Sequence, residues 1–177
     1  MNLPIKKYDK GARALHWLSA LLVIGALAAG WTMVGLPFSP LKVKAFNWHK
    51  WIGITVLALT LLRIVWRATH KPPEPLPMPA WQRKVAHALH GLLYLLLLAQ
   101  PLVGWANSSA AGIPVVWFGV LPLPDFVPHD KALAGNLEHL HGLLGLLLAV
   151  LIALHLLAAL KHHFIDRDDT LRRMLPH

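Results

Sequence analysis

The stretch LEHLHGLLGLLLAVLIALHLLAAL, residues 137–160, decides the fold class. A helix needs roughly 20 mostly apolar residues to cross the hydrocarbon core of a bilayer, and this stretch has them. Three similar stretches precede it, at about residues 14–34, 48–65 and 85–105. We therefore predict one all-α, integral-membrane domain over residues 1–177, in which four helices form a transmembrane bundle.

The composition leads to the same class of protein. Of the 177 residues, 56% are hydrophobic and 14% are charged, whereas an ordinary soluble domain has about 25% charged residues. A chain of this length cannot bury so much apolar surface in one aqueous core, so the surplus must face lipid. The chain has no cysteine, which excludes disulfides, iron–sulfur clusters and covalently attached haem.

Lysine and arginine predict the orientation of the spans. Of the 17 Lys and Arg residues, 13 lie in the two terminal tails or around the second connection, which share one side of the membrane. The positive-inside rule places that side, and both termini, in the cytoplasm. The net charge of +9 then reflects topology, and we expect no nucleic-acid partner. A signal peptide is the alternative interpretation of the first span, but its apolar run exceeds the usual length of about 7–15 residues.

Two connections have distinctive composition. Residues 71–79 include five prolines, which predicts a stiff, extended linker. Residues 113–128 carry four prolines among apolar side chains, and we expect this segment to lie along the membrane surface without crossing it.

Histidines inside the spans are the candidate functional residues, because an ionisable side chain in a membrane is costly and needs a partner. His141 and His155 are 14 residues apart, so on one helix they point within about 40° of each other and lie about 21 Å apart along the axis. His16 opens the first span and His49 opens the second span from the opposite side. Antiparallel threading therefore predicts two facing pairs, His16 with His155 and His49 with His141. Neutral imidazole is an iron ligand, so each pair could hold one haem iron.

Several alternatives stay open at this point. His90 in the third span lies near the depth of His16 and competes with it as the partner of His155, and spacing does not decide between them. Interhelical hydrogen bonding is the ordinary role of a single membrane histidine. Two imidazoles are too few for a structural zinc site. A proton path made of histidines would want carboxylates, and the spans contain only Glu138, at one edge.

Two arginines and one further histidine share this geometry. Arg63 is 14 residues after His49, so it should face the bundle interior at the depth of His16. It could bind a haem propionate there, or its head could extend to the membrane surface. Arg13, one turn outside His16, has the same two interpretations. His162, seven residues after His155, should lie at the membrane surface, where it could protonate a quinone or simply be solvated.

The sequence resembles the bacterial cytochrome b561 family over nearly its whole length. The segments that carry the resemblance are Arg13 to Trp17, Asn47 to Gly53 with Arg63 and Arg67 downstream, His90 through Tyr94 to Pro101 and Gly104, His141 with His155, and Lys161 to Met174. The order and spacing of these segments are more specific than any one of them. The resemblance implies a four-helix bundle in the bacterial inner membrane.

The resemblance also implies cofactors and ligands. It implies two non-covalent b-type haems, the outer one held by His49 and His141 and the inner one by His16 and His155. It implies electron exchange with ubiquinone near the inner haem, where His90 and His162 are candidate quinone residues and Arg13 and Arg63 are candidate propionate partners.

The pattern is most similar to superoxide oxidases, which take electrons from periplasmic superoxide and reduce ubiquinone. We therefore expect a superoxide:ubiquinone oxidoreductase with no assigned catalytic residue. Lys42, Lys44 and Lys50 near His49 would attract the superoxide anion. The alternative is an electron-conduit subunit that links a periplasmic dehydrogenase, hydrogenase or c-type cytochrome to the quinone pool. A haem-free transporter is a third hypothesis.

Overall fold

The computed structural model describes residues 6–175, which form four long helices and one small antiparallel sheet. The helices are α1 (Lys10–Val34), α2 (Pro40–Thr69), α3 (Ala80–Ala110) and α4 (Lys131–Phe164). The strands β1 (Val116–Trp117) and β2 (Leu121–Pro122) lie between α3 and α4. All four helices are long and apolar enough to cross a membrane, which confirms the predicted four-helix transmembrane bundle.

Each helix extends beyond the apolar stretch that predicted it. Asp9, Ser39 and Asp130 begin α1, α2 and α4, and each side chain accepts a hydrogen bond from a backbone N–H in the first turn. A capping oxygen of this kind satisfies one of the backbone donors that a helix start leaves without a partner. The apolar stretch therefore marks the middle of each helix, while the caps set where three of the four begin.

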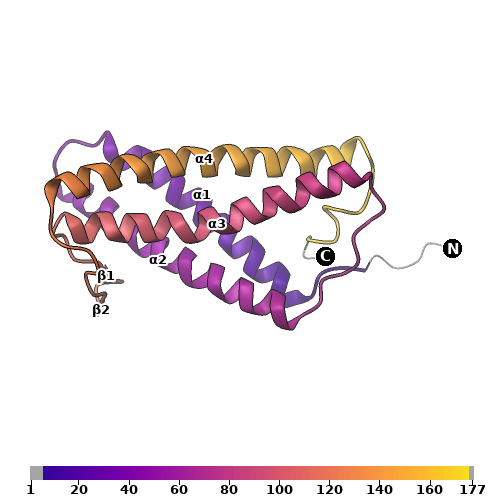
Figure 1. Ribbon diagram of the computed structural model, residues 1–177, viewed down its shortest axis with the longest axis horizontal. Coiled ribbons are helices and arrows are strands. Elements are labelled where there is room, and N and C mark those ends of the chain that lie inside the picture. Colours follow the sequence, from indigo (N-terminus) through magenta and orange to yellow (C-terminus); the bar gives the residue numbers. More distant parts are fainter. Residues whose placement is uncertain (1–5, 176–177) are drawn as a thin grey trace.

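Helices that follow one another in the chain pack side by side: α1 against α2, α2 against α3, and α3 against α4. Within residues 6–175, α1 and α4 are not in extensive contact. Both chain ends lie at one end of the bundle in Figure 1, and β1 and β2 lie at the other. We call these the terminal end, which includes the 70–79 linker, and the hairpin end, which includes residues 35–39 and 111–130.

All four helices contribute to a small apolar core at the middle of the bundle. The buried side chains of this core are Val23, Val56, Leu96, Leu97, Leu148 and Leu151. Many other large apolar side chains point outward, such as Leu21 at 69% and Leu157 at 61% exposure. In a bilayer these side chains face lipid, so the surplus of apolar residues needs no second core.

The hairpin formed by β1 and β2 was not predicted from the sequence. The backbone reverses at Phe118 and Gly119, which both have positive φ, at 51° and 72°. Two successive residues of this kind make the tight turn that joins antiparallel strands. Indole N–H groups attach the hairpin to α2, because Trp51 donates to the Val116 carbonyl and Trp117 donates to the Thr55 hydroxyl.

Candidate functional site

Two histidines from different helices face each other near the hairpin end. The ring centroids of His49 on α2 and His141 on α4 are 5.9 Å apart, with an angle of 86° between the ring planes. Nδ1 of His49 lies 3.0 Å from the Ala26 carbonyl on α1, and Nδ1 of His141 lies 3.1 Å from the Gln100 carbonyl on α3. Since a carbonyl can only accept, each ring carries its proton on Nδ1 and leaves Nε2 available as a ligand.

Glycines allow both rings to come this close to a neighbouring helix. A Cβ atom at Gly30, four residues after Ala26, would lie 3.2 Å from Cε1 of His49. A Cβ atom at Gly104, four residues after Gln100, would lie 2.8 Å from Cε1 of His141. In both cases the carbonyl also accepts the hydrogen bond of its own helix from the glycine four residues later. Because that glycine has no side chain, the histidine ring can reach the same carbonyl.

Gln100 makes a second, reciprocal contact with the same histidine. Its side-chain Nε2 donates to the backbone carbonyl of His141 at 2.9 Å. Gly145, one turn after His141, again provides the space, since a Cβ atom there would lie 3.1 Å from Nε2 of Gln100. Nothing in the sequence identified Gln100, because the carbonyl that accepts from His141 is known only from the packing of α3 against α4.

Three histidines meet near the terminal end. The ring of His155 on α4 lies 6.3 Å from that of His16 on α1 and 5.2 Å from that of His90 on α3, both measured between centroids. Both candidate partners of His155 are therefore within reach. Together with the apolar core between the two ends, this arrangement gives the bundle two separate histidine clusters.

Within residues 6–175, Arg63 is the cation in direct contact with the cluster at the terminal end. The Arg63 guanidinium on α2 approaches Nδ1 of His16 at 3.3 Å and lies 5.4 Å from the centre of the Tyr94 ring. Among residues 6–175, no Asp or Glu forms a salt bridge with Arg63. Arg13 faces a different group, because its guanidinium donates to the Leu175 carbonyl at 2.7 Å.

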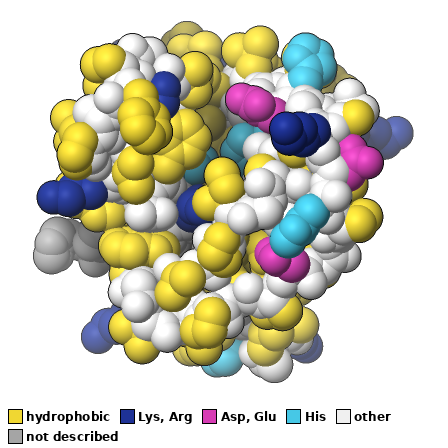
Figure 2. Space-filling view, turned by 90° about the vertical axis from the view of Figure 1, so that its left-hand side faces the viewer, with side chains coloured by type: hydrophobic (Ala, Val, Ile, Leu, Met, Phe, Trp, Pro, Cys, Tyr) yellow, Lys and Arg dark blue, Asp and Glu magenta, His cyan; other side chains and the backbone are white. Residues whose placement is uncertain are grey.

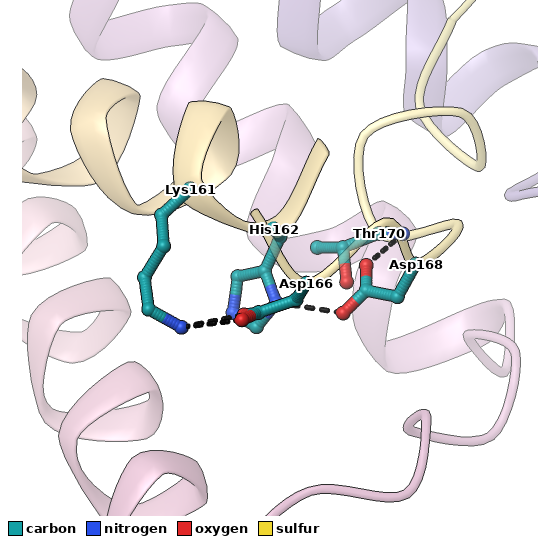
Figure 3. A network of polar contacts seen from close by, with 5 residues as sticks. All are labelled: Lys161, His162, Asp166, Asp168 and Thr170. Carbon is teal, nitrogen blue, oxygen red and sulfur yellow. Dashed lines mark hydrogen bonds and ion pairs between the residues drawn. The ribbon is translucent and has the colours of Figure 1, made fainter. Parts of the chain in front are cut away.

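His162 is part of a polar network just beyond the end of α4 (Figure 3). Its Nδ1 lies 2.7 Å from Asp168 and 3.2 Å from Asp166, and Lys161 pairs with the same Asp166 carboxylate at 2.6 Å. Although desolvation acts to raise it, the pKa of Asp168 is below its ordinary value, because hydrogen bonds from Thr170 and His162 favour the carboxylate. Both carboxylates contact the His162 ring through Nδ1.

The C-terminal segment folds back under α1, which the sequence did not predict. Trp17 donates to the Met174 carbonyl at 2.8 Å, and the Tyr8 amide donates to the Arg173 carbonyl at 3.2 Å. Arg173 in turn donates to the Glu74 carbonyl in the linker between α2 and α3. Hydrogen bonds to backbone carbonyls thus join distant parts of the chain at the terminal end.

The hairpin end presents a mixed surface, seen face-on in Figure 2, with hydrophobic side chains over much of it and Lys or Arg between them. Of the lysines singled out from the sequence, Lys42 donates to the Val34 and Leu36 carbonyls at the end of α1. Lys50 points towards α3, where its ammonium lies 3.2 Å from the Ser108 hydroxyl. These two lysines therefore do not form one cluster, and Lys50 is the one beside His49.

The geometry of both clusters suits a metal ion between two imidazoles. An ion bound at about 2 Å from one nitrogen of each ring separates the ring centres by roughly 6 Å. The observed centroid distances are 5.9 Å for His49 and His141 and 6.3 Å for His16 and His155. The Nε2 atoms and the glycine-lined positions of the first pair fit a haem iron, which His49 and His141 would hold and which would supply one-electron transfer.

Comparison with known proteins agrees with this geometry. Residues 7–177 match the family described as prokaryotic cytochrome b561. The chain is 41% identical to Cytochrome b561 homolog 2 of Escherichia coli (strain K12), over 98% of this chain and 93% of that protein. It is 35% identical to the Probable superoxide oxidase CybB of Yersinia pestis, over 97% of each. It is 33% identical to Cytochrome b562 of Cereibacter sphaeroides, over 95% of this chain and 94% of that protein. This chain therefore belongs to the prokaryotic cytochrome b561 family of haem b-binding, membrane-embedded electron-transfer proteins.

Proposed function

We propose that this protein is a di-haem cytochrome b that takes electrons from superoxide outside the bacterial inner membrane and passes them to ubiquinone at the inner side. The observation that carries the proposal is the presence of two facing histidine pairs, one near each end of a membrane-spanning bundle. The name of the Yersinia pestis relative, Probable superoxide oxidase, supports superoxide as the electron donor.

In this proposal four histidines would hold two haem irons. His49 and His141 hold the outer haem, and His16 and His155 hold the inner one. When bound, each haem supplies an iron that changes by one electron between Fe(III) and Fe(II). The chain contributes the positions of the four rings and, at His49 and His141, the tautomer with the proton on Nδ1. His90, at 5.2 Å from His155, is assigned to the quinone site.

The overall reaction requires two superoxide ions for each quinone. Each superoxide loses one electron and leaves as O2, and ubiquinone takes up two electrons and two protons to become ubiquinol. Lys50 is the cation nearest to His49 in the chain, and we assign it to attracting the superoxide anion. We assign His162 to delivering a proton, because its Nδ1 is held by Asp168 and Asp166 and its Nε2 is left for the substrate.

The distribution of charge supports the orientation in which the terminal end is cytoplasmic. The terminal tails and the linker between α2 and α3 carry most of the Lys and Arg residues, and such residues are retained on the cytoplasmic side. Superoxide would then meet the hairpin end and ubiquinone the terminal end. Arg63 is the proposed partner of an inner haem propionate, and Arg13, which donates to the Leu175 carbonyl, is the second candidate.

Haem content tests the ligand assignment. Purified protein with bound haem should carry two haems per chain. Alanine at His16, His49, His141 or His155 should each remove about one of them, whereas His90→Ala should keep both. Reduced-minus-oxidised spectra with a pyridine haemochrome assay measure this. A wild-type protein that binds one haem, or loss of haem from His90→Ala with none from His16→Ala, would overturn the assignment.

The electron donor is tested separately. Haem-loaded protein in liposomes should consume superoxide faster when ubiquinone is present, and His162→Gln should slow ubiquinol formation while superoxide still reduces the haems. If superoxide does not reduce the haems at all, the donor is wrong. One observation favours a conduit in that case: Phe118 and Val120 on the hairpin are 56% and 83% exposed, and a periplasmic redox protein that docks there should then co-purify.

A further inference from the structure

The two histidine clusters differ in the groups that contact Nδ1 of the rings. At the hairpin end, both His49 and His141 donate from Nδ1 to backbone carbonyls of neighbouring helices. At the terminal end, a guanidinium nitrogen of Arg63 lies 3.3 Å from Nδ1 of His16. A guanidinium has only N–H donors and a full positive charge, so it cannot replace an accepting carbonyl.

These surroundings act on a bound iron in opposite directions. A carbonyl that accepts from the Nδ1–H of a ligand makes the imidazole more basic, and a more basic ligand favours the ferric state. A cation near a metal centre inside a bundle favours the state with one more electron, since the low dielectric of the interior strengthens the interaction. This second effect has the same sign whether the cation acts on the iron, on the ligand or on a propionate.

From this asymmetry we infer that Arg63 gives the inner haem the higher reduction potential, while the carbonyls of Ala26 and Gln100 give the outer haem the lower one. Electron transfer from the haem at the hairpin end to the haem at the terminal end is therefore energetically favourable. The inference rests on the proposed function, because it takes the two histidine clusters as the two haem sites.

The charges at the hairpin end do not cancel this difference. Lys50 adjoins His49 in the chain, but its ammonium is held by the Ser108 hydroxyl and the Pro114 carbonyl and contacts neither ring. Lys42 is occupied by carbonyls at the end of α1. Arg63, by contrast, touches a ring directly and has no carboxylate partner among the described residues.

Redox titration of the purified holoprotein tests the inference. Wild type should titrate as two one-electron components of different potential. His155→Ala should remove the component of higher potential, and His141→Ala should remove the other. Arg63→Gln should lower the higher component and leave the lower one in place, and Arg63→Lys should restore most of the shift. Arg83→Gln is the control, since it removes the same charge from an exposed position at the start of α3.

The hairpin end provides an independent test on the other haem. Gly30→Ala should push the His49 ring from the Ala26 carbonyl and raise the potential of the lower component. Gly25→Ala on the same helix is the control, because a Cβ atom there meets nothing within 4 Å.

Each failure has a distinct signature. If His155→Ala removes the lower component, or if Arg63→Gln leaves the higher one unchanged with both haems bound, the inference is wrong. A wild-type protein with fewer than two haems instead overturns the proposed function. Should Arg63→Gln prevent haem uptake, the order of potentials is still decided by His141→Ala, His155→Ala and Gly30→Ala.

Discussion

Single glycines determine how closely two histidine rings approach a neighbouring helix. Glycine in a helix interior is normally unfavourable by about 1 kcal/mol relative to alanine. Gly30 and Gly104 lie in helix interiors, and a Cβ atom there would lie 3.2 and 2.8 Å, respectively, from a histidine ring. The glycines therefore lower intrinsic helix stability in exchange for a close contact between a ring and a carbonyl.

Gly104→Ala should release the His141 ring and cost the protein its outer haem. A Cβ atom at this position would lie 2.8 Å from the ring, so the ring must move, while helix propensity alone would favour alanine. We expect haem content to fall by about half, read from the haemochrome assay, consistent with the sensitivity of metal sites to the groups behind their ligands. Gly25→Ala should keep the wild-type content, and equal losses in both variants would contradict the argument.

At the scale of the element, the N-caps fix where α4 begins. Asp130 accepts from the Leu133 amide at 2.8 Å, and loss of such a cap costs about 1 kcal/mol. Asp130→Ala should lower the free energy of unfolding by this amount, measured in detergent by denaturant titration. Asp125→Ala is a fair comparison, since Asp125 contacts only the exposed His129 ring among the described residues, and it should change little.

The C-terminal segment after α4 should respond to acid. The folded segment lowers the pKa of Asp168 from its ordinary value of 3.8, so the stabilisation is present above that value and is lost as the pH falls through the lowered pKa. Amides of residues 168–175 should lose protection from hydrogen exchange between about pH 5 and about pH 2. Asp168→Asn should show weak protection throughout, and a wild-type segment that stays protected at the acid end would contradict this.

On the scale of the whole molecule, orientation can be measured directly because the chain contains no cysteine. A cysteine placed at Asp125, in the hairpin end, should react with a membrane-impermeant maleimide in intact spheroplasts. A cysteine placed at Arg167, near the terminal end, should react only after the membrane is opened. The opposite pattern would show that the hairpin end faces the cytoplasm.

Some parts of this molecule could be predicted from sequence and others could not. His141 and His155 are 14 residues apart on one helix. Because helix geometry is regular, this spacing was enough to predict histidine pairs at two depths in the membrane. The position of His90, the link between Gln100 and His141, and the folded C-terminal segment depend on how helices rotate against one another. Phe118 and Gly119 form a turn too short to be recognised among prolines, where one bulky residue adopts a positive φ.

The helices α1 and α4 pack little against each other. His16 on α1 and His155 on α4 face each other across the gap between these two helices, with ring centroids 6.3 Å apart. If a haem fills the space between α1 and α4, these two helices stay poorly packed in a newly made chain until the haem binds. We expect such chains to be digested sooner by membrane proteases in cells starved of iron. Supply of the prosthetic group would then set the amount of this protein in the membrane.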